Sequence, residues 1–194
     1  MYNSSIKGQG TRVSFTEHEE VPEKIFFNDL SKNGFAEPFR RCDVIFSEIA
    51  WQYGFGVFNE RAGNEPSAYS DYLDNINKLV HELNVPAFII CGKNAAKHFT
   101  DFRTAEIKIN LSGTSMAGCV LYIWNYSGAT PKTTSALIMQ LQSQFKCCLD
   151  FSCGYGEHLI GFEDFVGCDI DRDCLTYLTR LYKGGKHGST AKAD

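Results

Sequence analysis

Residues 148–157 read Cys-Leu-Asp-Phe-Ser-Cys-Gly-Tyr-Gly-Glu, and residues 165–171 read Phe-Val-Gly-Cys-Asp-Ile-Asp. In both stretches a short apolar run, typical of a buried strand, ends in an acidic residue, Asp150 in the first and Asp169 in the second. Two glycines follow the first run, and a short helical pattern separates them from the second. A strand, a glycine turn, a helix and a second strand ending in an acid form the layout of a nucleotide-binding unit, which predicts an α/β fold.

The glycines and the second acid have separate tasks in such a unit. Gly154 and Gly156 carry no side chain, so the turn after the first strand can lie against a nucleoside. Asp169, at the carboxyl end of the next strand, is placed to accept hydrogen bonds from both hydroxyls of a ribose. A purely structural turn is the alternative, but the glycines and the second acid together favour a nucleoside cofactor.

This region resembles the cofactor loop of the S-adenosylmethionine-dependent amino-methyltransferases, whose pattern runs approximately Leu-Asp-Pro-Phe-Cys-Gly-Ser-Gly-Thr and later Phe-Ile-Gly-Ile-Asp-Ile-Asp. The residues on matching positions are Asp150, Cys153, Gly154, Gly156 and Asp169. Glu157 and His158 stand where the family usually has small hydroxyl residues.

The resemblance implies both a fold and a cofactor. The fold is a Rossmann-like methyltransferase α/β fold, with a mostly parallel sheet, an antiparallel edge hairpin, helices on both faces and a circularly permuted motif order. The cofactor is S-adenosylmethionine, and no metal is expected. The residues implied to bind it are Asp150, Phe151, Cys153, Gly154, Gly156, Asp169, Ile170 and Lys132. Lys132 is included because it lies near the position of a basic signature that precedes the cofactor loop in the family.

A second signature precedes the cofactor loop. The apolar run 42–47 predicts a strand, and residues 48–51 read Glu-Ile-Ala-Trp where the family has Asp-Pro-Pro-Trp or Asp-Pro-Pro-Tyr. An exocyclic amine of adenine or cytosine is a poor nucleophile because its lone pair is delocalised into the ring. An acceptor on its hydrogens and an aromatic ring stacked on the base help it to attack a methyl group. The predicted catalytic residues are Glu48 as the acceptor and Trp51 or Tyr53 as the stacking platform.

Three functions remain open from the sequence. The first is a methyltransferase acting on a nucleobase amine in DNA or RNA, with adenine favoured. The second is a catalytically degenerate relative that binds or regulates, because Ile49 and Ala50 replace the two prolines of the family. The third is an enzyme acting on a small metabolite or on S-adenosylmethionine itself. Taken alone, Glu48 is better explained as a solvent-facing acid at a strand end and Trp51 as a core aromatic, and it is the glycine loop downstream that favours an active site.

The remaining pattern predicts one domain over residues 12–182, with flexible segments at 1–11 and 183–194. Further strands are expected at 24–29 and 86–93, and a hairpin is expected from 106–111 and 119–126. Helices are expected at 69–83, 94–99 and 132–144, the first with a clear amphipathic spacing. The catalytic-type signature thus comes first in the chain and the cofactor loop last.

The composition of the chain restricts the kinds of molecule that it is expected to bind. The 194-residue chain is 43% hydrophobic and 22% charged, with a net charge of −4. This charge argues against strong unaided binding to nucleic acid, so a homodimer, a partner subunit or a single-stranded substrate could make up the deficit. No apolar run has the length of a membrane span and no secretion signal is present, so a cytoplasmic location is expected. Most of the eight cysteines lie in apolar runs, which predicts reduced core thiols.

Overall fold

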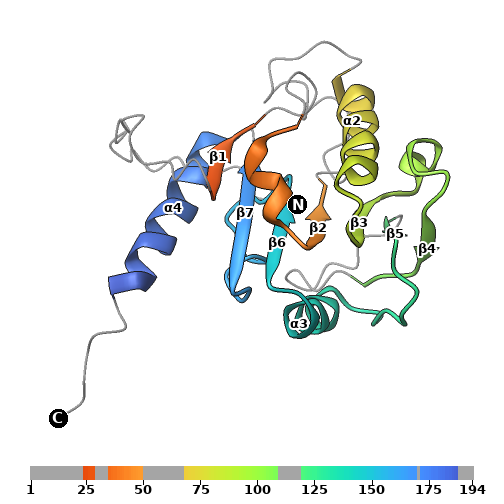
Figure 1. The fold of residues 1–194 in the computed structure, drawn as a ribbon. Helices are drawn as coiled ribbons and strands as arrows, with labels where there is room; N and C mark the ends of the chain where they lie inside the picture. Colours follow the sequence, from red (N-terminus) through yellow and green to blue (C-terminus); the bar gives the residue numbers. More distant parts are fainter. Residues whose placement is uncertain (1–23, 29–34, 50–67, 109–118, 170, 188–194) are drawn as a thin grey trace, which may run out of the picture.

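The computed structural model describes residues 24–28, 35–49, 68–108, 119–169 and 171–187, which build one α/β sheet with helices on both faces (Figure 1). The N-terminal half holds, in chain order, β1 Ile25–Phe27, η2 Glu37–Arg41, β2 Val44–Glu48, α2 Ala68–Leu83, β3 Ala87–Gly92 and η3 Lys93–His98. The C-terminal half holds β4 Arg103–Ala105, β5 Cys119–Trp124, α3 Thr134–Gln144, β6 Cys147–Asp150, β7 Asp164–Asp169 and α4 Arg172–His187.

The strands of the sheet lie in the order β1-β7-β6-β2-β3-β5-β4. The first five strands of this order pair in parallel, whereas β5 runs antiparallel to both β3 and β4. The strand that leads into the catalytic-type signature, β2, lies beside β6, which carries the cofactor-loop sequence, although about a hundred residues separate them. This arrangement confirms the expected mostly parallel sheet with an antiparallel edge and a permuted motif order.

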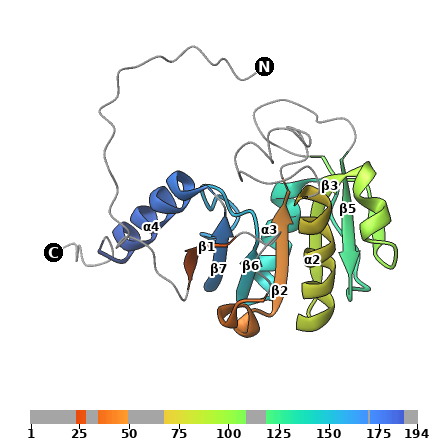
Figure 2. The same ribbon diagram turned by 90° about the horizontal axis from the view of Figure 1, so that it is seen from above.

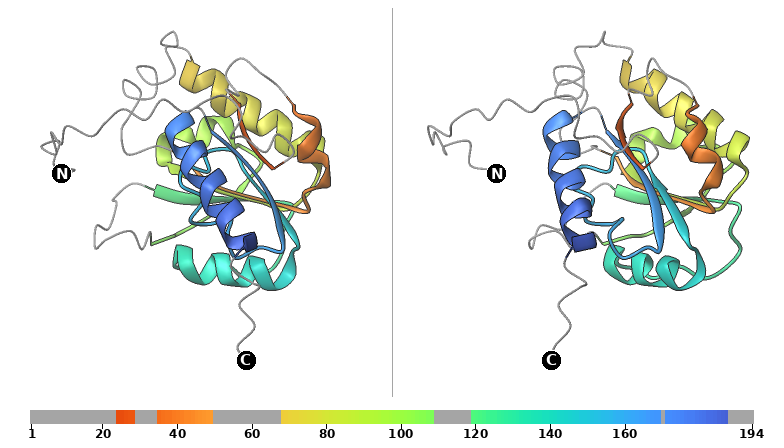
Figure 3. Two further views of the ribbon diagram at one scale, coloured as in Figure 1. Left: turned by 90° about the vertical axis from the view of Figure 1, so that its left-hand side faces the viewer. Right: turned by 60° about the vertical axis from the view of Figure 1, so that its left-hand side comes forward.

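Burial explains why the central strands are uniformly apolar. Every residue of β3 is buried, as is every residue of β6, because helices cover both faces of the sheet. Helix α2 and the short η2 and η3 turns cover one face, and α3 and α4 cover the other (Figure 3). Helix α4 packs at the end of the sheet formed by β1 and β7 (Figure 2).

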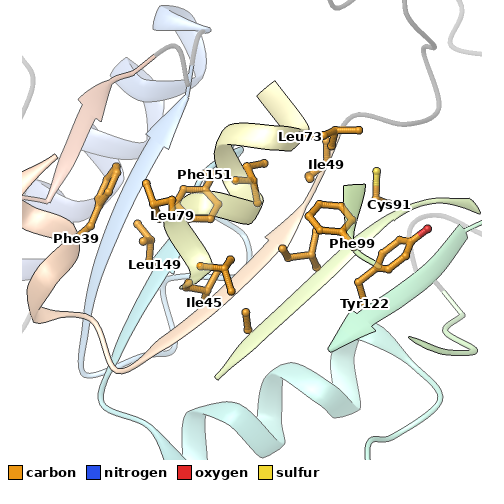
Figure 4. Packing of buried hydrophobic residues seen from close by; sticks show 14 of the residues in the cluster. Phe39, Ile45, Ile49, Leu73, Leu79, Cys91, Phe99, Tyr122, Leu149 and Phe151 are labelled. Carbon is orange, nitrogen blue, oxygen red and sulfur yellow. The ribbon is translucent and has the colours of Figure 1, made fainter. Parts of the chain in front are cut away.

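The core beneath α2 is built from large side chains of the helix and of the sheet (Figure 4). Leu73 of α2 lies beside Ile49, which follows β2, and Leu79 of the same helix belongs to the same cluster as Ile45 and Leu149 of the neighbouring strands β2 and β6. Phe99 lies against Tyr122 with ring centroids 5.0 Å apart. Residues 69–83, predicted as a helix from their apolar spacing, form α2 with nearly the same bounds.

Three expectations are corrected. No helix follows the glycines: residues 157–163 form turns. The strand expected at 106–111 is displaced, because β4 ends at Ala105 and Lys108 makes an isolated parallel bridge with Thr133 instead. The segment predicted to be a flexible tail from 183 begins inside α4, which continues to His187. The segment 1–11 and residues 188–194, both expected to be flexible, lie outside the described residues.

All eight cysteines are buried, which agrees with their predicted place in the core. Within the described ranges, no histidine, cysteine and carboxylate side chains gather into a group that could hold a metal ion. None of the helices in these ranges combines the length and the apolar character that crossing a membrane requires.

Candidate functional site at the carboxyl edge of the sheet

The predicted site residues converge where the parallel strands end. Asp150 ends β6, Asp169 ends β7 and Glu48 ends β2, and all three strands run in the same direction side by side. The carboxyl edge of such a sheet is where ligands of open α/β folds bind. The topology therefore brings together acids that lie far apart in the sequence.

The two glycines after β6 both adopt the left-handed conformation, with φ of +50° at Gly154 and +74° at Gly156. They differ in what surrounds them. A Cβ on Gly156 would lie 2.2 Å from Cδ1 of Leu178 on α4, whereas a Cβ on Gly154 would meet no atom within 4 Å. Gly156 is thus required for packing, while Gly154 presents bare backbone to open space, as a loop that a ligand approaches must.

The carboxylate of Asp169 holds this loop in place. Its Oδ2 accepts a hydrogen bond of 2.8 Å from the backbone N–H of Gly154, and its Oδ1 accepts one of 2.9 Å from the N–H of Asp171. A carboxylate can accept about four hydrogen bonds, so these bonds are compatible with a ribose beside them. Asp169 is therefore both the predicted ribose acceptor and the anchor of the glycine turn.

Asp150 is buried, with 1% of its surface exposed. Its Oδ1 accepts hydrogen bonds from the Ser47 hydroxyl at 2.9 Å and from the N–H of Ser152 at 3.0 Å. Oδ2 is buried and has no hydrogen-bond partner among the described residues. Burial raises the pKa of Asp150 to about 7, against the opposing effects of the His158 charge and these hydrogen bonds.

Ser47 and Asn28 belong to the site but were not predicted. Ser47 bridges β2 and β6, because its hydroxyl donates to Asp150 and accepts from the N–H of Phe151 at 2.9 Å. Asn28 follows β1, is 5% exposed, and leaves its Oδ1 buried without a partner in the described part of the chain. Their position, as polar residues at the end of predicted apolar strands, is the feature of the sequence from which both could have been predicted as site residues. Buried acceptors without partners at Asn28 and Asp150 fit the donors of a nucleoside.

Glu48 is paired with His158, from the turns that follow the glycine loop. Nε2 of His158 lies 3.3 Å from Oε2 of Glu48, an ion-pair distance without hydrogen-bond geometry, and the two side chains are 18% and 14% exposed. The His158 ring also packs edge-on against Phe46, with centroids 5.1 Å apart. Burial lowers the pKa of His158, but contact with Glu48 and the charges of Asp150 and Glu48 outweigh it, so the net shift is upward.

The other predicted cofactor residues lie as follows. Phe151 and Cys153 are buried in the core, so their side chains face away from open space. Lys132 is exposed just before α3, where its carbonyl accepts a 2.7 Å hydrogen bond from the N–H of Lys108, on the β4 side of the sheet. Trp51, Tyr53 and Ile170 lie outside the described residues.

No protein-family model matches the chain, and no curated protein sequence does either. Solved structures do. The crystal structure of M1.HpyAVI is 13% identical, with 82% of this chain and 98% of that chain covered and a TM-score of 0.49. TTHA0409 from Thermus thermophilus, described as a "Putative DNA Modification Methylase", is 13% identical, with coverage of 85% and 96% and a TM-score of 0.48. Its selenomethionine derivative is 11% identical, with the same coverage and a TM-score of 0.51. The last likeness concerns the fold, and it agrees with the expected Rossmann-like methyltransferase fold.

Proposed function

We propose that this chain is a methyltransferase that uses S-adenosylmethionine to methylate an exocyclic amine of a nucleobase, adenine foremost, in DNA or RNA. One observation carries the proposal. The backbone of Gly154 faces open space while its N–H is held by Asp169, and this loop sits on β6, next to the strand that ends in Glu48. The methyltransferase-like fold supports the same reaction class.

On this proposal, Asp169 and the backbone at Gly154 hold the nucleoside part of the cofactor, and Asn28 offers a buried acceptor beside it. When bound, S-adenosylmethionine supplies an activated methyl group. Asp150 orders the start of the loop through Ser47 and the N–H of Ser152. Trp51 or Tyr53 stacks on the target base, and Glu48 accepts a hydrogen bond from its amine, which strengthens the amine as a nucleophile.

The proposed acceptor is a polynucleotide, although the net charge of −4 provides little sequence-independent attraction to phosphates. A basic partner subunit would supply the missing positive charge, whereas a second copy of the chain would add contact surface but again a net charge of −4. Analysis of the methylated product identifies the modified base and shows whether DNA or RNA is the substrate.

The first test is calorimetric titration with S-adenosylmethionine. Asp169→Ala should weaken binding roughly tenfold or more, because it removes a charged acceptor from the ribose. Asp164→Ala is the matched control: it removes an aspartate from the other end of the same strand, where Asp164 pairs with Arg41 at 3.1 Å. Equal affinity in the wild type and in Asp169→Ala would contradict the assigned cofactor site.

The same protein is then incubated with labelled cofactor and with single-stranded and duplex oligonucleotides. Glu48→Ala should reduce methyl transfer about a hundredfold or more while cofactor affinity stays nearly unchanged. Normal transfer by this variant would show that Glu48 is not the amine acceptor.

A second candidate, a cofactor-binding protein without transferase activity, is favoured by one specific contact. The N–H of Ile49 donates a 2.9 Å hydrogen bond to the carbonyl of Ile90, so the β2–β3 ladder continues where the family has a proline that could not donate. Binding of S-adenosylmethionine without transfer to any polynucleotide would select this candidate.

A further inference from the structure

We propose that His158 is the proton partner of Glu48: Glu48 receives the proton that the target amine loses, and the imidazole Nε2, 3.3 Å away, takes it over. This inference rests on the proposed methyltransferase function. It assigns a role to the histidine that replaces a small hydroxyl residue of the family pattern, and this histidine acts through Glu48 as a positioning residue.

The geometry holds the pair together in a water-poor place. Glu48 is fixed by β2, which lies between β3 and β6, and His158 by the turns after the glycine loop. Both side chains are mostly buried, and Phe46, two residues before Glu48 on the same strand, packs against the imidazole ring. Oε2 of Glu48 makes no hydrogen bond within the described residues, and Nε2 of His158 lies 3.3 Å from it.

The proton has to leave because of how the bond forms. The amine nitrogen uses its lone pair to bond the methyl carbon while the carbon–sulfur bond breaks and its electron pair stays on sulfur. The nitrogen then carries a positive charge and releases one proton to the Glu48 carboxylate. A neutral His158 accepts that proton and becomes an imidazolium, which returns it to solvent at the end of the cycle. No other reactant is needed.

The charges around His158 set the pH at which it can act. Glu48 on β2 and Glu157, the residue before His158, place negative charge near the ring, and Asp150 on β6 adds to it as it ionises near its own pKa of about 7. The thiol of Cys119 on β5 interacts in turn with the charge of Glu48. These carboxylates stabilise the protonated imidazole, and a protonated imidazole cannot accept. Transfer should therefore rise with pH as His158 loses its proton, at a pH above the ordinary histidine value of about 6.5.

The test compares the pH dependence of kcat in three proteins. The wild type should gain activity with rising pH, whereas His158→Asn should lose this rise and show kcat lowered roughly tenfold or more at high pH. His98→Asn is the matched control, because His98 is also buried and paired with a carboxylate, with Nδ1 2.6 Å from Asp74, but lies on η3 away from the glycine loop. It should keep the wild-type profile. Cofactor affinity should be unchanged in both variants.

A second measurement does not depend on turnover. The imidazole proton resonance of His158, identified by its absence in His158→Asn, is titrated by NMR in the wild type and in Glu48→Gln. Its titration midpoint should move to lower pH in Glu48→Gln, because a negative neighbour is lost. An unmoved midpoint, or a His158→Asn profile that keeps the rise in an otherwise active enzyme, would overturn this inference alone. Absence of transfer by the wild type on every polynucleotide would overturn the proposed function as well.

Discussion

At the scale of single residues, Gly154 and Gly156 are glycines for different reasons. Both have positive φ, which costs a residue with a Cβ roughly 1 kcal/mol or more. Only at Gly156 does the protein itself fill the space of a side chain, since Cδ1 of Leu178 lies 2.2 Å from where a Cβ would stand. The space in front of Gly154 is left open, and the cofactor is the group proposed to use it.

Alanine substitutions should separate these reasons. Gly156→Ala should lower the free energy of unfolding by about 2–4 kcal/mol, because strain and overpacking add. Gly154→Ala should cost only about 1 kcal/mol, yet weaken S-adenosylmethionine binding roughly tenfold or more, because its methyl group occupies the approach to the backbone. Urea denaturation and calorimetry measure the two quantities. Equal losses of stability in both variants would contradict the assignment.

The site residues that could be predicted from the sequence were those that belong to a recognisable short motif. Gly154 and Asp169 stand in a recognisable spacing, and the structure joins them by a hydrogen bond. Ser47 and His158 were not predicted as site partners, because their contacts with Asp150 and Glu48 bridge segments about a hundred residues apart in sequence. Such contacts depend on which strands become neighbours, and no single stretch carries that information.

At the scale of elements, β2 and β6 are also fastened at their amino ends, opposite the site. The carboxylate of Asp43 accepts hydrogen bonds from the N–H groups of Lys146 and Cys147, at 3.0 and 2.9 Å. Beside it, Sγ of Cys42 and Sγ of Cys147 lie 3.5 Å apart. The hydrogen bond between the two thiols lowers the pKa of Cys147 to about 7; burial opposes this shift and Arg41 assists it.

These two thiols should form a disulfide when oxidised glutathione is added. The Cys147 thiolate attacks the glutathione disulfide. The hydrogen bond with Cys147 and burial raise the pKa of Cys42, but once Cys147 is in the mixed disulfide the first of these causes is gone; Cys42 then displaces glutathione, and two glutathione thiols are released. Mass spectrometry should find the Cys42–Cys147 cross-link, and Cys42→Ala should abolish it. Cys174→Ala is the control, because burial raises the pKa of Cys174 to about 12 and leaves it unreactive. Faster modification of Cys174 than of Cys147 would contradict this expectation.

Elements with a long, regular pattern were predicted well, and short ones were not. Helix α2 has several turns of apolar spacing, which is enough to define it from sequence alone. Residues 157–163 form too short a segment for the hydrogen bonds of a helix to offset the free-energy cost of helix nucleation. In addition, Gly161 packs so closely on Gln142 that a Cβ at this position would lie 2.1 Å from Nε2 of Gln142. Strand β4 was misplaced because its register is set by β5, where Arg103 lies opposite Ile123.

At the scale of the whole molecule, the sheet is completed by its first strand. Ile25 of β1 lies opposite Gly167 of β7, and the N–H of Gly167 donates a 2.7 Å hydrogen bond to the carbonyl of Lys24. Lys24 and Arg41 both pair with Asp164 at the start of β7. The strand that presents Asp169 is therefore flanked by a segment from the opposite half of the chain.

Global stability should accordingly depend on β1. Ile25 is fully buried, so Ile25→Ala should lower the free energy of unfolding by about 2–5 kcal/mol. Phe27 in the same strand is 36% exposed and lies under the Arg172 guanidinium, so Phe27→Ala should cost no more than about 1 kcal/mol. Chemical denaturation compares the two. A larger loss from Phe27→Ala would show that β1 is not held by burial of Ile25.

The pairing of β1 with β7 also has a consequence for synthesis. Of the described strands, β1 leaves the ribosome first and its partner leaves last, on the order of ten seconds later at usual translation rates. Until then the backbone groups of β1 have no ladder to join, and the strands between them can assemble on one another. The edge that carries Asn28 and Asp169 therefore forms late, so the nascent chain completes its proposed cofactor pocket only after nearly all of the sheet has been made.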